Sequence, residues 1–186
     1  MQYDAVVVGG CGHVGLPLAI SLAGVGIRTG IFDIAQSVVG MVNEGRMPFY
    51  EEDAEEALRE VTKSGYLVAS SDASIIEGAR FVIVVIGTPV DDHMNPDPNA
   101  VLRVLKQCIP YMGLAELVVL RSTVFPGVTR RVETIVKAAE LKGTVAFCPE
   151  RILEGKAMSE LHELPQIVGC RDDETEQKAR ELFTSL

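Results

Sequence analysis

The sequence has no apolar run long enough to cross a bilayer, which takes about 18–20 consecutive residues. Its first residues, Met1 to Asp4, place no basic segment before the short apolar run that follows, so we expect no secretory signal. Repeats, low-complexity tracts and long linkers are missing as well. We therefore expect a cytoplasmic protein with no membrane partner, built around one globular domain.

Cysteines are few, and acidic residues outnumber basic ones. The four cysteines, Cys11, Cys108, Cys148 and Cys170, show no C-x-x-C spacing and are expected to be reduced thiols. The 26 acidic and 17 basic residues give a net charge of −9, which argues against nucleic acid because phosphate neutralisation needs clustered Lys and Arg. The loop 91–99 holds three aspartates and a histidine, but its turn-forming residues predict a solvated loop, and we expect no metal site. An anionic cofactor stays compatible with this charge, because the amides at a helix start bind phosphate locally.

Strand-like and helix-like segments alternate along the whole chain. Strands are predicted over 4–9, 27–33, 67–70, 81–87, 116–122 and 144–150. Helices are predicted over 14–25, 35–44, 52–63, 73–78, 98–109 and 128–141, with the segment 166–170 and a polar helix from about Asp172 at the end. The run FVIVVIG (81–87) is the most apolar, as expected of a strand covered on both faces. The pattern predicts an α/β fold with a doubly wound parallel sheet, a Rossmann-type domain.

The motif G-x-G-x-x-G occurs at Gly10, Gly12 and Gly15, after the first predicted strand and at the start of the first predicted helix. In this context the first glycine permits the tight turn, the second lets a pyrophosphate approach the backbone, and the third lets the helix pack closely. The amides of Cys11 to Val14 would then face the phosphates. This motif predicts a dinucleotide site.

Asp33 ends the second predicted strand, 23 residues after Gly10. A carboxylate at this place accepts hydrogen bonds from the adenosine ribose hydroxyls and repels a 2′-phosphate. No Arg or Lys occurs from 34 to 45 to receive that phosphate. The predicted cofactor is therefore NAD and not NADP.

Three later strands end in polar segments: Gly87-Thr88-Pro89, Arg121-Ser122-Thr123, and the loop from Cys148 to Gly155. Ligands of open parallel sheets bind at the carboxyl ends of the strands, so these segments are expected to meet where a nicotinamide and its substrate lie. Thr88 and Thr123 are each equally consistent with a helix cap. The carboxylates Glu150 and Glu154, four residues apart, favour a site.

Together these motifs resemble the NAD-binding domain of the UDP-glucose/GDP-mannose dehydrogenase family. The matching stretches are GCGHVGLPLA (10–19), IFDI (31–34), NEGRMPFYEEDAEEAL (43–58), GTP (87–89), STVFPGVT (122–129) and PERILEG (149–155), in the family's order across essentially the whole chain. The resemblance implies an NAD-dependent enzyme that oxidises the C6 alcohol of a nucleotide sugar to an aldehyde and then to a carboxylate, with two NAD.

The resemblance also implies site residues. The cofactor would contact Gly10, Gly12, His13, Val14, Gly15, Asp33, Thr88, Pro89, Ser122, Thr123 and Glu154. The sugar would contact Glu150, Arg151, Ile152, Leu153 and Glu154. Thr123, Glu150 and Glu154 would be catalytic, positioning water and handling protons. The sequence PER, where other members have PEF, resembles the members that act on UDP-N-acetylhexosamines such as UDP-N-acetylmannosamine, with UDP-glucose as the second candidate.

Family members carry a nucleophilic cysteine in a later G-G-x-C-F-P-K-D-type motif, and no such motif occurs in these 186 residues. Cys148 at a strand end is expected to be a core thiol instead. We therefore interpret residues 1–186 as an NAD-binding domain without the central dimerisation and C-terminal substrate domains, inactive by itself, from an enzyme that forms a homodimer or larger assembly. The alternatives are a β-hydroxyacid or 6-phosphogluconate-type dehydrogenase and a non-catalytic NAD-binding module.

Overall fold

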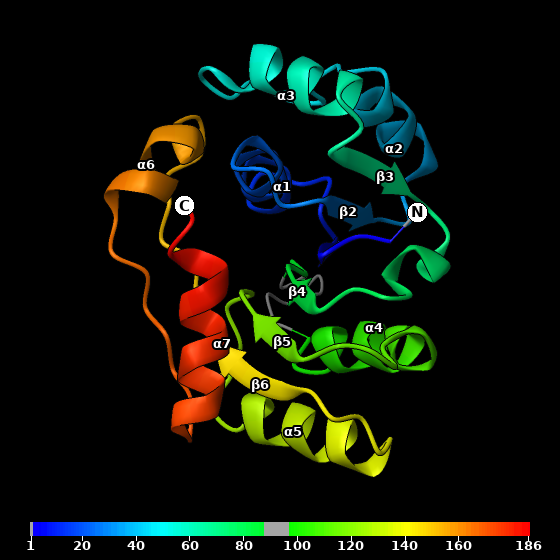
Figure 1. Ribbon diagram of the computed structural model, residues 1–186, viewed down its shortest axis with the longest axis vertical. Coiled ribbons are helices and arrows are strands. Elements are labelled where there is room, and N and C mark those ends of the chain that lie inside the picture. Colours follow the sequence, from blue (N-terminus) through cyan, green and yellow to red (C-terminus); the bar gives the residue numbers. More distant parts are fainter. Residues whose placement is uncertain (1, 88–96) are drawn as a thin grey trace.

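A sheet of six parallel strands forms the centre of the computed structural model, in the order β3-β2-β1-β4-β5-β6 (Figure 1). The structure describes residues 2–87 and 97–186. The strands are β1 (Ala5–Val8), β2 (Thr29–Phe32), β3 (Leu67–Ser70), β4 (Phe81–Val84), β5 (Leu117–Leu120) and β6 (Thr144–Phe147). β1 pairs with β2 on one side and with β4 on the other, so the winding reverses next to β1. This order is that of the Rossmann fold, which confirms the predicted fold class.

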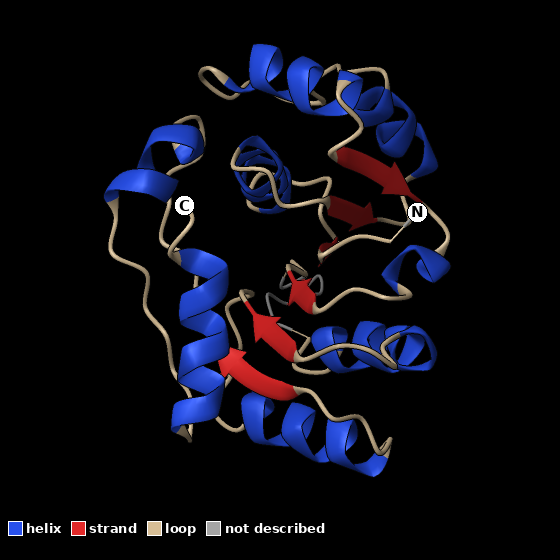
Figure 2. Ribbon diagram, in the orientation of Figure 1, coloured by secondary structure: helices blue, strands red, loops and turns tan. Residues whose placement is uncertain are grey.

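Helices cover both faces of the sheet (Figure 2). They are α1 (Gly15–Gly24), α2 (Gln36–Asn43), α3 (Ala54–Lys63), α4 (Ala100–Cys108), α5 (Val128–Ala138), α6 (Ala157–Glu163) and α7 (Asp173–Phe183), with 3-10 turns η1 (Ala73–Ile76) and η2 (Ile109–Tyr111). Ala5 and Val7 of β1 pack with residues of α1, α2, α3 and α7. Val6 and Val8 pack with residues of α4 and α5 on the opposite face. The two-residue alternation of a strand thus divides the core into two halves.

The four residues of β4 are all buried, as are those of β1, β2 and β5. Strands covered on both faces have no solvent-facing positions to fill with polar residues. This confirms that the apolar segment 81–87 is a strand covered on both faces, although the strand itself ends at Val84.

The structure differs from the sequence prediction in the last third of the chain. Helix α6 was not predicted, and residues 166–170 contribute one antiparallel bridge, between Phe147 and Gly169, and no strand. The other strands and helices are present, but most are shorter by one to three residues at an end. No helix in the described ranges combines the length and the apolar character that a membrane crossing needs.

Candidate functional site

The glycine turn after β1 depends on four glycines for different reasons. Gly9 has a φ of +74°, and a Cβ on it would lie 2.6 Å from the carbonyl oxygen of Val85. A Cβ on Gly15 would lie 2.6 Å from the Cα of Gly10, so the first turn of α1 packs directly against the glycine loop. These positions admit no side chain. The predicted reason for Gly15 is thus confirmed. A Cβ on Gly10 would lie 2.9 Å from the carbonyl oxygen of Val7, so this turn position also needs a glycine, while the left-handed φ belongs to Gly9.

Gly12 differs from these glycines, because a Cβ placed on it would meet nothing within 4 Å. The backbone there is open to solvent and not pressed against protein. Among the described residues, none accepts a hydrogen bond from the amides of Gly12, His13 or Val14. These amides lie at the start of α1, where the helix dipole favours an anion.

Asp33 follows β2 and turns its carboxylate toward the same loop. Its Oδ2 accepts a hydrogen bond of 3.0 Å from the amide of Cys11, and its Oδ1 accepts one of 3.1 Å from the amide of Ala35. The Cys11 amide is therefore engaged by protein, which corrects the expectation that all the amides from Cys11 to Val14 face phosphates. The carboxylate keeps unused lone pairs, since each oxygen can accept more than one hydrogen bond.

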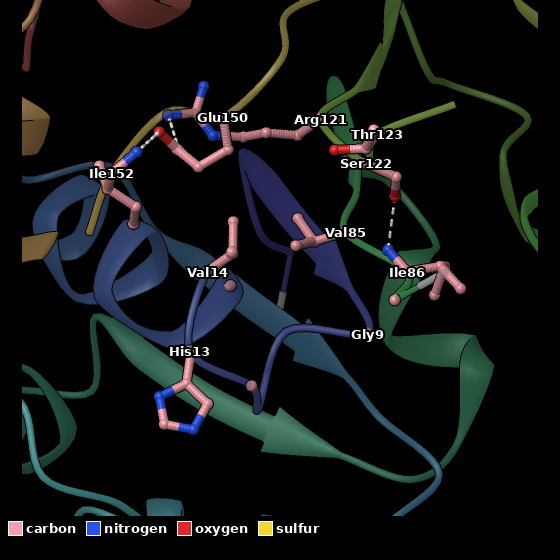
Figure 3. A pocket seen from close by; sticks show the side chains of 13 residues that line it. Gly9, His13, Val14, Val85, Ile86, Arg121, Ser122, Thr123, Glu150 and Ile152 are labelled. Atoms are coloured by element: carbon pink, nitrogen blue, oxygen red, sulfur yellow. Dashed lines mark hydrogen bonds and ion pairs between the residues drawn. The ribbon is translucent and has the colours of Figure 1, made fainter. Parts of the chain in front are cut away.

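A cavity of about 340 Å³ opens at the carboxyl ends of β1, β4, β5 and β6 (Figure 3). It is lined by Gly9, Gly12, His13, Val14, Gly15, Val85, Ile86, Gly87, Arg121, Ser122, Thr123, Glu150 and Ile152. It lies between the ends of β1 and β4, where the winding of the sheet reverses and where open α/β sheets bind ligands. The structure thus joins the glycine loop to residues of all three polar strand ends in one site.

Ser122 joins the ends of β4 and β5. Its hydroxyl accepts a hydrogen bond of 2.7 Å from the amide of Ile86 and donates one of 3.3 Å to the carbonyl of Val84. The side chain is buried, and Figure 3 shows its bond to Ile86 at the cavity wall. Thr123, the next residue, is exposed and lines the cavity. Ser122 therefore shapes the site, and Thr123 presents its hydroxyl to it.

Glu150 forms an ion pair with Arg121 across the ends of β6 and β5. Its other oxygen, Oε1, accepts hydrogen bonds from the amides of Arg151 and Ile152, at 2.7 and 3.2 Å. Burial lowers the pKa of the Arg121 guanidinium from its ordinary value, while the Glu150 carboxylate opposes that shift. The guanidinium nevertheless stays charged, because arginine does not lose its proton in proteins.

The rest of the loop 149–155 turns away from the cavity. Arg151 donates from Nη2 to the carbonyl of Pro165, the amide of Leu153 donates to Oε2 of Glu160, and Glu154 is exposed. None of these three residues lines the cavity. Of the predicted sugar-contacting residues, the structure therefore places Glu150 and Ile152 in the cavity together with the glycine loop. The others lie outside the cavity.

Glu51 fixes the far end of this loop. Its buried carboxylate accepts hydrogen bonds of 3.0 Å from the amide of Gly155 and 2.6 Å from the amide of Ala157. Ala157 is the first residue of α6, so Glu51 also caps that helix. This links the segment before α3 with the loop after β6.

His13 is exposed and its ring stacks on Phe49, with 3.9 Å between the ring centroids and 31° between the planes. Figure 3 shows the ring turned away from the Glu150 wall. Thr88 and Pro89, also predicted to bind the cofactor, lie outside the described residues, as do residues 91–96 of the loop considered for a metal. The described residues contain no cluster of His, Cys, Asp and Glu suited to a metal ion.

Three residues of the cavity wall escaped the sequence prediction: Gly9, Val85 and Ile86. Gly87 and Arg121 lie in the predicted polar strand ends, but no contact was predicted for either. Arg121 carried a readable signal, because an arginine that ends an apolar strand must find a partner for its charge. Gly9 directly precedes Gly10, and the sequence does not tell which of the two adjacent glycines makes the turn. Val85 and Ile86, directly after β4, have no chemical signature in the sequence.

Comparison with protein families decides between the interpretations. The model of the NAD-binding domain of the UDP-glucose/GDP-mannose dehydrogenase family matches residues 4–186. The chain belongs to this family. The NAD-binding assignment is that of the family domain, and it agrees with the predicted cofactor. The family match favours the first interpretation over a β-hydroxyacid or 6-phosphogluconate-type dehydrogenase.

Among the relatives in this family is the NDP-N-acetyl-D-galactosaminuronic acid dehydrogenase of Ralstonia nicotianae, 29% identical over 98% of this chain and 45% of its own length. The UDP-N-acetyl-D-mannosamine dehydrogenase of Pyrococcus horikoshii is 27% identical, with a solved structure at a TM-score of 0.89 that covers 97% of this chain and 44% of its own. A structure of the Methanosarcina mazei NDP-N-acetyl-D-galactosaminuronic acid dehydrogenase is 28% identical, with a TM-score of 0.90, covering 99% of this chain and 42% of its own. The chain thus spans less than half the length of these relatives.

The residues present fit a bound NAD. The open backbone at Gly12, with amides at the start of α1, suits a diphosphate. The Asp33 carboxylate, held beside the loop by the Cys11 amide, suits the ribose hydroxyls. The cavity then continues to Thr123 and Glu150, which gives the remaining half of the dinucleotide a place against the ends of β4, β5 and β6.

The cysteines of this family domain are free, and only Cys170 is exposed. Burial raises the pKa of the Cys148 thiol to about 12, and burial together with the Asp33 carboxylate raises that of Cys11 to about 12. A thiol of this kind is protonated near neutral pH and nucleophilically inert. This agrees with the interpretation of Cys148 as a core residue.

We therefore expect iodoacetamide to modify one thiol per native chain at mildly alkaline pH, and all four cysteines after denaturation. Mass spectrometry of the peptides should place the native label on Cys170, and Cys170→Ser should remove it. Fast native labelling of Cys148 would contradict its inert, buried state.

Proposed function

We propose that these residues are the NAD-binding half of a cytoplasmic nucleotide-sugar 6-dehydrogenase, which converts the C6 alcohol of a UDP-sugar to a carboxylate. The single observation that carries this proposal is the cavity that joins the open glycine loop to Thr123 and Glu150. A hydroxyl and a carboxylate at the far wall of a dinucleotide site are the groups needed to orient an alcohol and manage its proton.

Bound NAD would supply the hydride acceptor for both two-electron oxidations, from the alcohol to the aldehyde level and from the aldehyde to the carboxylate level. The chain's own residues hold the cofactor and orient the sugar. The amides of Gly12 to Val14 bind the diphosphate, and the Asp33 carboxylate accepts hydrogen bonds from the ribose hydroxyls. Ser122 keeps the ends of β4 and β5 together. Thr123 and Glu150 face the reacting end of the sugar. Glu154, a catalytic residue by the motif, lies on the exposed part of the loop outside the cavity.

The proposed substrate is a UDP-N-acetylhexosamine, with UDP-N-acetylmannosamine ahead of UDP-glucose. The support comes from the relatives, several of which are named UDP-N-acetyl-D-mannosamine dehydrogenases. Arg151, the residue that distinguishes PER from PEF, bonds to the Pro165 carbonyl and does not line the cavity. Its proposed contribution to preference is therefore the shape of the loop.

The proposal includes a second part of the enzyme, with a dimerising and a substrate-binding region and a nucleophilic cysteine, in a homodimer or larger assembly. The support is that relatives are more than twice as long as this chain. The test is formation of NADH by the complete protein with UDP-N-acetylmannosamine, UDP-N-acetylgalactosamine and UDP-glucose. We expect two NADH for each sugar consumed, and none from residues 1–186 alone. A complete protein that binds NAD but oxidises no UDP-sugar would overturn the proposal.

Asp33 provides a test of the cofactor site on this chain alone. Calorimetry should show NAD bound well ahead of NADP, because the carboxylate repels a 2′-phosphate. Asp33→Ala should weaken NAD binding by about 1–3 kcal/mol, the range for lost hydrogen bonds to a charged group. Asp33→Asn is the matched variant: it keeps an acceptor for the backbone amides but loses the charge, so it should bring the two affinities closer together. Equal NAD affinity in the wild type and Asp33→Ala would place the ribose elsewhere.

A further inference from the structure

The cavity wall holds a buried charge that the proposed function leaves without a role. Arg121 is 3% exposed, directly follows β5, and lies two residues before Thr123. A buried arginine is costly unless its charge and its donors are met by the protein. Its partners therefore show what the residue is built to hold.

Three elements converge on the guanidinium. Glu150, after β6, supplies the carboxylate of the ion pair. Gln166 accepts a hydrogen bond of 2.7 Å from Nη1. Phe183, in α7, lies with its ring centroid 5.3 Å from the Arg121 Cζ, within reach of a cation–π contact. The guanidinium is thus fixed from several sides before any ligand arrives.

The backbone adds a further link between the same two residues. The amide of Glu150 donates a hydrogen bond of 3.4 Å to the carbonyl of Arg121, beyond the last paired residues of β5 and β6. Arg121 therefore contacts Glu150 through both its main chain and its side chain, while its own chain leads directly into Ser122 and Thr123. The two side chains that face the reacting end of the site come from different strands, and Arg121 is the residue that joins them.

We propose that Arg121 is a positioning residue for the reaction: it holds the Glu150 carboxylate, and with it the first part of the loop 149–155, at a fixed place relative to Thr123. This inference rests on the proposed function. Figure 3 shows Arg121 extended along the cavity wall toward Glu150, with Glu150 in turn bonded to the Ile152 amide. The Glu150 carboxylate is thus held by the Arg121 ion pair at one oxygen and by two backbone amides at the other, which fixes its direction as well as its position.

A purely structural ion pair would behave differently. Replacing a buried ion pair by apolar residues is often neutral for stability, so retention of the pair in a cavity wall needs another reason. A positioning role predicts that loss of Arg121 accelerates hydrogen exchange at the loop amides and lowers kcat. It also predicts that both effects depend on Glu150.

The first arm of the test uses this chain and needs no substrate. In Arg121→Met, hydrogen exchange at the amides of Arg151 and Ile152 should accelerate at least tenfold, while exchange in β1 and NAD affinity stay within threefold of the wild type. Arg121→Lys should recover part of the protection. Arg80→Met is the matched control, because Arg80 also pairs with carboxylates, Glu116 and Glu181, but before β4 and away from the cavity. Unchanged exchange at Arg151 and Ile152 in Arg121→Met would overturn the proposal.

The second arm uses the complete protein with NAD and the UDP-sugar. Arg121→Met should lower kcat at least a hundredfold with little change in KM for NAD. The double variant Arg121→Met/Glu150→Gln should be no slower than the slower single variant, because both changes remove one interaction. Effects that multiply would overturn the proposal, and so would a kcat that stays at the wild-type value. If Arg121→Met fails to fold, the kcat of Arg121→Lys is compared with that of Arg121→Lys/Glu150→Gln in the same way. Absence of turnover in the wild type overturns the proposed function instead, and the exchange measurement then decides the positioning of Glu150 by itself.

Discussion

Gly12→Ala should remove NAD binding and leave the stability of the domain unchanged. A Cβ at this position meets no protein atom within 4 Å, and the residue has no left-handed φ, so alanine fits the free protein. The added methyl group would stand where the diphosphate approaches the backbone amides. We expect at least a hundredfold weaker NAD binding, about 3 kcal/mol, by calorimetry, together with an unfolding midpoint in urea equal to that of the wild type.

The matched substitution Gly15→Ala should, in contrast to Gly12→Ala, lower the stability of the domain. Its Cβ would lie 2.6 Å from the backbone of Gly10, and backbone atoms cannot move aside as a flexible side chain can. Overpacking of this kind costs about 1–3 kcal/mol or more, so the unfolding midpoint should fall clearly. Gly24→Ala, in the same helix and with open space around it, is the control for the substitution itself. NAD binding at wild-type strength in Gly12→Ala would show that the diphosphate does not lie over this loop.

Glu51→Ala should be the most damaging loss of a single carboxylate in the described residues. It would leave the buried amide of Ala157 and the partly buried amide of Gly155 without acceptors. An unsatisfied buried donor costs about 1–3 kcal/mol, so we expect a loss of about 2–4 kcal/mol from the free energy of unfolding in urea. Glu51→Gln should lose less, since one oxygen remains to accept a hydrogen bond.

The neighbouring Glu52 gives the control for this prediction. It is exposed, and Glu52→Ala should change stability by no more than about 0.5 kcal/mol. Limited proteolysis should in addition show faster cleavage within residues 150–165 in Glu51→Ala, because the loop and α6 lose their attachment. Equal stability of Glu51→Ala and Glu52→Ala would mean that the buried carboxylate does not hold the loop.

Local chemistry explains how much of this fold and site could be predicted. The apolar run of β4 needs no partner to be read as a strand covered on both faces, and the glycine motif followed by Asp33 specifies the first βαβ unit within about 30 residues. Ser122 and Thr123 could be placed in the site because the carboxyl ends of parallel strands share one edge of the sheet.

The parts that escaped prediction depend on distant contacts. The left-handed turn falls on Gly9 because the Val85 carbonyl, from the neighbouring strand end, occupies the space that a Cβ would need. Helix α6 begins at Ala157 under a cap from Glu51, 106 residues earlier, which no local pattern reveals. The sugar contact predicted for Arg151 stays a prediction, but its bond to the Pro165 carbonyl, outside the cavity, could not be read from the motif.

The strand order has a consequence for the growing chain. β1 is central, and its second neighbour, β4, begins only at Phe81. A nascent chain that ends before this residue holds β3, β2 and β1, and the backbone N–H and C=O groups along one edge of β1 have no strand partner. The wall of the cavity formed by Val85 to Gly87 does not yet exist at that stage. Synthesis from the amino terminus therefore makes the glycine loop first and closes the cavity only after the other half of the sheet has begun.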